Sequence, residues 1–383
     1  MSLRGSLGAR PILTGRLTPL ISALIVLLAC HLQSRGADTS SGSFISGTFR
    51  GLIQAQSFND ESYGFFTFAL TRSGAFSGRF TYGKNSYPLH GKFNPDGSYR
   101  FEGPDYRTHL ARPRFIDLQL SPADGSGIVT GNITDLTHDA TLSGDRARNY
   151  SPGDSAPYVG SYTFGIRPAA TDNAPRGSGF GRVTVDSFGR VAVTGFTGDG
   201  TPFTEGTSLA VGGRWPMYAR LPGTAGVISG EMIFRDTSES DFDGSITWLG
   251  TEVPFVSDIV RAYVNNFVVQ VDVVGSRYRY NPGTPVLNLN LASPNARLNF
   301  AGGAVDGEID KAISLSTRNQ VLFVPRGAGD SMTVSPTLGF FTGSFYADRR
   351  LGRFRGVVLQ KQNAGVGFFL EGGQAGNVWL LPD

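Results

Sequence analysis

The chain has 383 residues and a formal net charge of +3, but Arg4, Arg10 and Arg16 in its first 29 residues supply that excess. Beyond them basic and acidic residues balance at 31 each, which excludes a basic nucleic-acid-binding surface, and we expect no nucleic-acid partner. The 52 glycines are about twice the usual share, and with 28 Phe and 13 Tyr to build a core they exclude a disordered chain and favour short strands joined by tight turns.

Residues 1–29 have the pattern of a signal peptide. The three arginines precede ten mostly apolar residues, 20–29 (LISALIVLLA), which would span only about 15 Å as a helix, half of a bilayer core. The next residue is Cys30, the only cysteine, and Leu27-Leu28-Ala29-Cys30 resembles a bacterial lipobox. The resemblance implies lipidation of Cys30. Ordinary signal-peptidase cleavage is the alternative, although no small-x-small site lies nearby.

Residues 30–43 are small and polar, as in a flexible tether. His31 would be the second residue of the mature chain, and by analogy with lipoprotein sorting this predicts outer-membrane delivery, on either the periplasmic or the surface side. With one cysteine, intrachain disulfides are excluded, and a chain of this length can bury a sufficient core without them.

Residues 44–150 are predicted to form the first β domain. Apolar residues alternate, as in Phe66-x-Phe68-x-Leu70, and short turns rich in Gly, Asn and Asp separate about eight strands in residues 44–147. This pattern indicates an up-and-down barrel or a strongly twisted meander, with a sandwich as the alternative.

After a linker at 149–157, residues 158–256 repeat the same hairpin pattern and are predicted to form a second β domain. Residues 257–383 are either a third domain or a continuation of the second, and residues 257–264 would form a short helix capped by Ser257. Internal duplication and convergence on common turns both explain the similarity. The predicted fold class is all-β: antiparallel meanders forming two or three small barrels or sandwiches, with one short helix at most.

Three stretches resemble the uncharacterised glycine-rich β modules of exported proteins from Verrucomicrobia-type bacteria. They are residues 71–80 (TRSGAFSGRF), 212–218 (GGRWPMY) and 356–369 (GVVLQKQNAGVGFF). The resemblance implies an exported β protein and brings no active site. The order of anchor, tether and hairpins also resembles surface lipoproteins whose small barrels capture host proteins, such as transferrin-binding lipoproteins.

The sequence lacks a Gly-x-Ser-x-Gly elbow, a phosphate-binding loop and a His-Glu-x-x-His helix. Its histidines lack ligand spacing, and we expect neither a cofactor nor a metal. Glu239, Asp241 and Asp243 resemble the start of a calcium loop, but Gly250 stands where that loop needs glutamate, so a solvated hairpin turn is favoured.

Aromatic and charged residues leave other binding roles open. Trp215 and Tyr218 are candidates for stacking on a sugar, with burial in the core as the favoured alternative. A cluster of arginines, predicted to flank a turn at Leu351-Gly352, would be a charged hairpin tip or a contact for a polyanion. A carboxylate pair for glycoside hydrolysis would have to come from distant strands, with candidates Asp117, Asp135, Asp186 and Glu231.

The leading hypothesis is a non-enzymatic, lipid-anchored β-repeat protein of the cell envelope with a structural or binding role. Its partners would be the membrane, through the N-terminal lipid, and an envelope protein or polysaccharide. The alternative is an exported carbohydrate-binding or carbohydrate-active protein. An outer-membrane pore ranks third, because the predicted strands are shorter than the nine to eleven residues that spanning strands need.

Overall fold

The structure is a computed structural model, which describes most of the chain after residue 43. The described residues are 44–55, 63–83, 85–103, 113–121, 127–135, 138–169, 171, 174–222, 226–250, 266–290, 292–347 and 350–383. The leader, Cys30, the tether and the predicted helix at 257–264 lie outside them. In the described part of the chain, no helix has the length and apolar character needed to cross a membrane.

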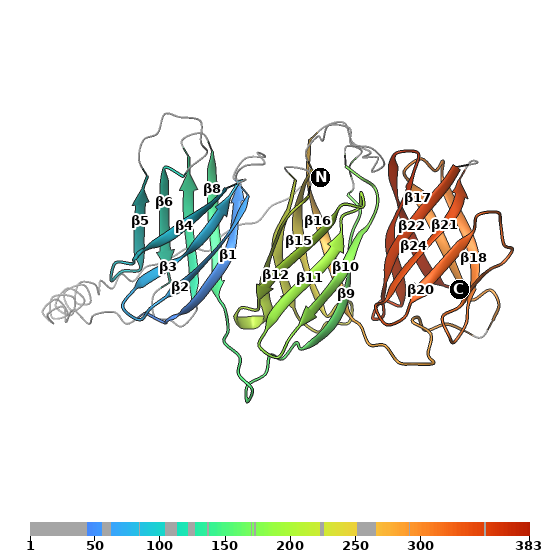
Figure 1. Cartoon of the computed structure of the whole chain (residues 1–383), viewed down its shortest axis with the longest axis horizontal. Helices are drawn as coiled ribbons and strands as arrows, with labels where there is room; N and C mark the ends of the chain where they lie inside the picture. The colour runs from blue at the N-terminus through green and yellow to red at the C-terminus, as the bar shows by residue number, and fades with distance from the viewer. Residues whose placement is uncertain are drawn as a thin grey trace, which may run out of the picture. The chain divides into compact units, whose positions relative to one another are not determined.

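Within the described ranges, twenty-four strands form three antiparallel sheets (Figure 1). The first contains β1 (Gly47–Ala55), β2 (Gly64–Leu70), β3 (Ala75–Tyr82), β4 (Asn85–Lys92), β5 (Ser98–Glu102), β6 (Phe115–Leu120), β7 (Ile128–Thr134) and β8 (Asp139–Arg146). The second contains β9 (Gly160–Ile166), β10 (Gly179–Val185), β11 (Arg190–Phe196), β12 (Pro202–Ser208), β13 (Arg214–Arg220), β14 (Val227–Phe234), β15 (Phe242–Gly250) and β16 (Phe267–Arg277). The third contains β17 (Ala296–Gly302), β18 (Glu308–Leu315), β19 (Val321–Phe323), β20 (Ser331–Ser335), β21 (Phe340–Ala347), β22 (Arg350–Leu359), β23 (Ala364–Glu371) and β24 (Gln374–Pro382).

The first two sheets have the same strand order. In the first it is β4-β3-β2-β1-β8-β7-β6-β5, and the second repeats it, whereas the third is β19-β18-β17-β24-β23-β22-β21-β20, with its open edges displaced by one strand. The first strand of each sheet pairs with the eighth, which curls the sheet into a nearly closed barrel. The two unpaired edges are the fourth and fifth strands in the first two sheets and the third and fourth strands, β19 and β20, in the third sheet. We call the line between the two edges of a barrel the seam.

The predicted all-β class and the eight strands in residues 44–147 are confirmed. The only helical element in the described residues is a 3₁₀ turn, Val211–Gly213. The sequence pattern placed the end of the second domain at residue 256. The second sheet extends beyond this residue, because β16 pairs with β9 and β15. A third sheet then begins at β17.

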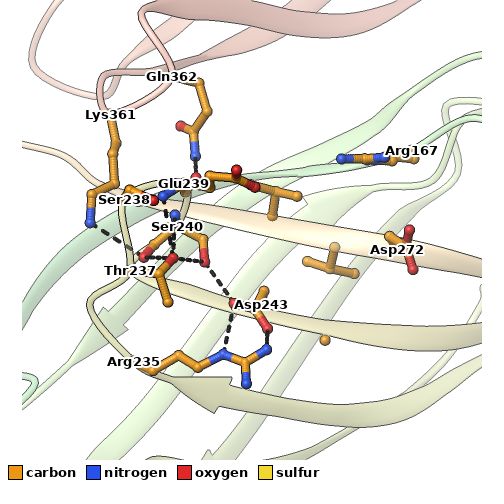
Figure 2. Close-up of a pocket in the computed structure, with 13 residues that line it drawn as sticks. Arg167, Arg235, Thr237, Ser238, Glu239, Ser240, Asp243, Asp272, Lys361 and Gln362 are labelled. Carbon is orange, nitrogen blue, oxygen red and sulfur yellow. Dashed lines mark hydrogen bonds and ion pairs between the residues drawn. The ribbon is translucent and has the colours of Figure 1, made fainter.

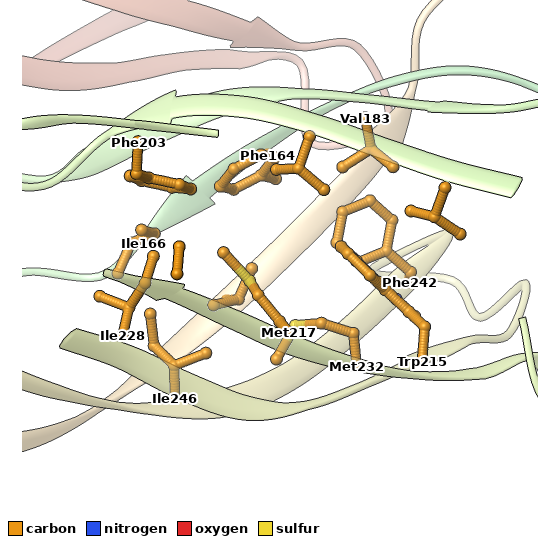
Figure 3. Packing of buried hydrophobic residues seen from close by; sticks show 14 of the residues in the cluster. Phe164, Ile166, Val183, Phe203, Trp215, Met217, Ile228, Met232, Phe242 and Ile246 are labelled. Carbon is orange, nitrogen blue, oxygen red and sulfur yellow. The ribbon is translucent and has the colours of Figure 1, made fainter. Parts of the chain in front are cut away.

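Each barrel is filled by its own side chains, because inward and outward residues alternate along every strand. The first core contains Phe49, Phe66 and Phe68, and the third contains Phe300, Phe345 and Phe369. In the second, Trp215 and Phe242 pack beside Met217 and Met232 (Figure 3).

The barrels also contact one another within one compact unit, Ser43–Asp383. Phe180 of the second barrel packs with Val357 and Phe368 of the third, and the Thr163 hydroxyl donates to the Val358 carbonyl at 2.6 Å. The first and second barrels meet through an apolar cluster of Tyr63 with Val227 and Leu249, and through Arg214, which lies 3.3 Å from Asp145.

Candidate functional site

Trp215 and Tyr218 do not form a shared stacking platform. A spacing of three along a strand places two side chains on opposite faces. Trp215 points inward and is 1% exposed in the core of the second barrel (Figure 3). Tyr218 points outward and stacks on Phe65 of the first barrel, with ring centroids 6.3 Å apart. The joint stacking hypothesis is therefore corrected, since both rings already pack against protein.

The predicted calcium residues lie at the β14–β15 hairpin, in a groove of about 910 Å³ (Figure 2). Hydrogen bonds from Arg235 hold the pKa of Asp243 below its usual value. Asp241 lies 3.0 Å from Lys361 Nζ and accepts the Arg277 N–H at 2.6 Å. Among the described residues, no cluster of three His, Cys, Asp or Glu side chains has a geometry for a metal. Asp241 and Asp243 pair with cations of the protein instead.

Lys361 links the third barrel to the second across this groove (Figure 2). Its ammonium contacts Asp236, Asp241 and the Ser240 carbonyl. Burial alone would lower the pKa of Lys361, but the hydrogen bonds to the two aspartates outweigh it and the pKa is raised. The polar groups of the groove therefore serve mainly to join two barrels.

We expect Lys361→Met to lower the free energy of unfolding by about 1–2 kcal/mol, because partly buried Asp241 loses its ammonium partner. Thermal unfolding measured by circular dichroism tests this. Lys92→Met, which removes an exposed lysine from β4, is the control. Equal melting temperatures for the two variants would show that the Lys361 contacts do not stabilise the junction.

The four candidate hydrolytic carboxylates are not brought together. Asp117 pairs with Arg100 at 3.2 Å, and Asp135 with His138 at 3.3 Å, both in the first barrel. In the second barrel, Asp186 accepts the N–H groups of its own turn, and Glu231 lies 2.8 Å from Arg214. Each is occupied by a local partner.

The predicted arginine turn is also corrected. Leu351 and Gly352 are not a turn, because β22 begins at Arg350 and runs through both. Arg353 and Arg355 are exposed in the burial pattern of β22, and Arg355 lies over the Phe196 ring at 5.2 Å from its centroid. Arg349 lies outside the described residues.

Sequence reasoning missed a pocket in the seam of the first barrel, between β4 and β5. One end of this seam is closed by hydrogen bonds. The Asn94 N–H donates to the Ser98 carbonyl at 2.8 Å, and the Tyr99 hydroxyl donates to the His90 carbonyl at 3.1 Å. Away from that turn the edges separate, and the space between them is the pocket.

The pocket has a volume of about 320 Å³ and mainly apolar walls. Phe101 pairs across the sheet with buried Ile116 and so belongs to the inward face of β5, yet it is 38% exposed. Tyr87 stacks on Phe80, with ring centroids 5.2 Å apart. An exposed inward-facing ring shows that the barrel interior is open here. The described residues that line it are Phe80, Tyr87, Pro88, Leu89, His90, Tyr99, Phe101, Gly103, Pro113 and Ile116.

The corresponding seam of the second barrel, between β12 and β13, is closed differently. The Glu205 carboxyl accepts the Tyr218 N–H across it, and burial raises the pKa of Glu205 to about 8. Arg50 on β1 of the first barrel donates to Ser208 on β12, beside Glu205. One barrel therefore contacts the seam of the next, whereas the pocket in the first seam is open.

Comparisons with known proteins give a distant structural likeness. No protein-family model matches the sequence, and no curated protein matches it. Among solved structures, transferrin-binding protein B from Haemophilus parasuis is 9% identical, with 88% of this chain and 75% of that one covered and a TM-score of 0.20. The isotype 1 protein from Neisseria meningitidis is 10% identical, with 89% and 77% covered and a TM-score of 0.21. Likeness at this level assigns no site and no ligand.

Proposed function

We propose that this chain is an exported, non-enzymatic binding protein of the cell envelope, held at the outer membrane by lipid on Cys30. The observation that carries the binding role is the open, aromatic-walled pocket in the seam of the first barrel. Pockets of a few hundred Å³ with apolar walls and few polar groups are typical ligand sites.

The distribution of charged side chains supports binding over catalysis. In the described part of the chain no carboxylate lines the seam pocket, so these residues place no acid pair for hydrolysis there. At the large groove, Asp243 pairs with Arg235, and Asp236 and Asp241 pair with Lys361. These carboxylates are thus engaged in structural contacts.

The order of segments supports an anchored protein. The lipobox-like leader is followed by the tether of residues 30–43, and β1 of the first barrel starts at Gly47. A tether of this length reaches at most about 45 Å when extended. Three acyl chains on Cys30, at about 0.8 kcal/mol per buried CH₂, would make the anchor effectively permanent.

We expect wild-type cells to incorporate radioactive palmitate into this protein and Cys30→Ala cells to incorporate none, because the sequence contains no other thiol that could form the thioether. Labelled protein is measured after immunoprecipitation, and membrane fractionation shows where it resides. Ser34→Ala, in the tether, is the control and should label normally. Absence of label from the wild type would refute the anchor and leave a protein released in soluble form or held by its leader.

A further inference from the structure

We infer that the seam pocket of the first barrel binds a compact, uncharged aromatic molecule. This inference rests on the proposed binding role and names its ligand class. The pocket is small, at the lower end of the range for ligand sites, and three aromatic side chains from different strands converge on it: Phe80, Tyr87 and Phe101. A flat ring can pack face-on or edge-on against such walls.

The charges around the pocket argue for a neutral ligand. Among the residues that the structure describes, no Lys, Arg, Asp or Glu lines it. The nearest charged residues of β5 are directed elsewhere, since Arg100 pairs with Asp117 at 3.2 Å and Glu102 with Arg114 at 3.1 Å. A charged ligand would lose hydration on entry and gain no counterion from the wall.

The seam edge argues against an added peptide strand. Tyr82 pairs with Asn85 at the end of the β3–β4 ladder, and alternation from that pair directs the backbone groups of Pro88 and His90 toward the seam. Pro88 has no N–H to donate, and the His90 carbonyl already accepts the Tyr99 hydroxyl. On β5, the Ser98 N–H donates to Asp96 at 2.9 Å. These backbone groups beside the turn are therefore not available to pair with an added strand.

The polar inventory of the pocket argues against a sugar. A sugar ring carries several hydroxyls, and each buried one needs a partner. The polar side chains in the wall are His90 and two tyrosines, and the Tyr99 hydroxyl is already used as a donor. An aromatic ring with one polar atom fits this inventory better.

The test is calorimetric titration of the mature chain with indole, with indole-3-acetate as the matched anion and with maltose as the sugar. We expect one indole to bind per chain and indole-3-acetate to bind at least tenfold more weakly. Phe101→Glu introduces a carboxylate into the wall and should weaken indole binding at least tenfold. Phe188→Glu, at an equally exposed ring in a turn of the second barrel, should leave it unchanged.

Circular dichroism serves to check that each variant folds. Phe101→Ala removes the ring without adding charge and should weaken indole binding severalfold. Indole-3-acetate binding as tightly as indole would overturn the charge argument. Indole binding that survives both Phe101 changes would overturn the assigned site. If maltose binds and indole does not, and maltose binding requires Phe101, the ligand class would be overturned and the binding role would be kept. Binding of none of the three would overturn the inference, while palmitate labelling at Cys30 would still decide the anchored envelope role separately.

Discussion

We expect the wild-type protein to lose stability as the pH rises from 5 to 8. Replacing Glu205 with glutamine should abolish most of this loss. Burial in the seam of the second barrel raises the pKa of this carboxyl from 4.5 to about 8, and the Tyr218 N–H and Arg50 offset the effect only in part. Its Oε2 atom is buried without a hydrogen-bond partner. The folded protein therefore holds a proton that the unfolded chain releases.

The sign of the effect follows from this proton. Below pH 4.5 both states are protonated and the carboxyl contributes no pH dependence. Between pH 4.5 and pH 8 the unfolded chain ionises while the folded state does not, so stability falls as the pH rises. A shift from 4.5 to about 8, at 1.36 kcal/mol per pKa unit, gives a loss of roughly 4–5 kcal/mol at most above pH 8.

Urea denaturation of wild type and Glu205→Gln at pH 5, 7 and 8.5 measures this loss. The glutamine amide oxygen still accepts the Tyr218 N–H, so the variant should match the wild type near pH 5 and exceed its stability at pH 8.5. Glu308→Gln, at an exposed carboxyl on β18, should retain the wild-type pH dependence. A wild-type stability that is level from pH 5 to pH 8.5 would show that Glu205 ionises normally in the folded state.

Local sequence patterns predict the strands because alternation and turn chemistry are local properties. The alternation in Phe66-x-Phe68-x-Leu70 and the Asn94-Pro95-Asp96-Gly97 sequence between β4 and β5 are readable within a few residues. The closure of each barrel is not local, since β1 pairs with β8 almost a hundred residues later. The sequence therefore predicts eight strands in the first domain and leaves a sandwich open as the alternative.

The site depends on contacts that a pattern does not contain. Alternation places Phe101 on the inward face with Tyr99, and only the separation of β4 from β5 exposes its ring. The Phe65–Tyr218 stacking joins residues of two barrels and has no sequence signal. By contrast, the opposite orientations of Trp215 and Tyr218 follow from their spacing of three, and period-two reasoning alone would have separated them.

Gly51→Ala is expected to unfold or strongly destabilise the first barrel. Gly51 on β1 lies opposite Gly144 on β8, at the pairing that closes the barrel. A Cβ atom there would come within 2.1 Å of the Ser143 carbonyl oxygen, 2.4 Å of Gly144 Cα and 2.6 Å of the Phe66 ring. Two of these neighbours are backbone atoms, so relief requires moving strands. We expect a loss of at least about 3 kcal/mol, at the high end for a single substitution.

Gly206→Ala is the matched control, because a Cβ at this β12 glycine meets no atom within 4 Å. The stability of this variant should change by less than about 1 kcal/mol.

All three tryptophans, Trp215, Trp248 and Trp379, lie in the second and third barrels. If the barrels unfold separately, Gly51→Ala should lose far-ultraviolet circular dichroism at a low urea concentration while tryptophan emission stays native. Simultaneous loss of both signals would show that the contacts of Arg50 and Arg214 make the first two barrels one cooperative unit. If Gly51→Ala were as stable as the wild type, the close approach of β1 and β8 would be contradicted.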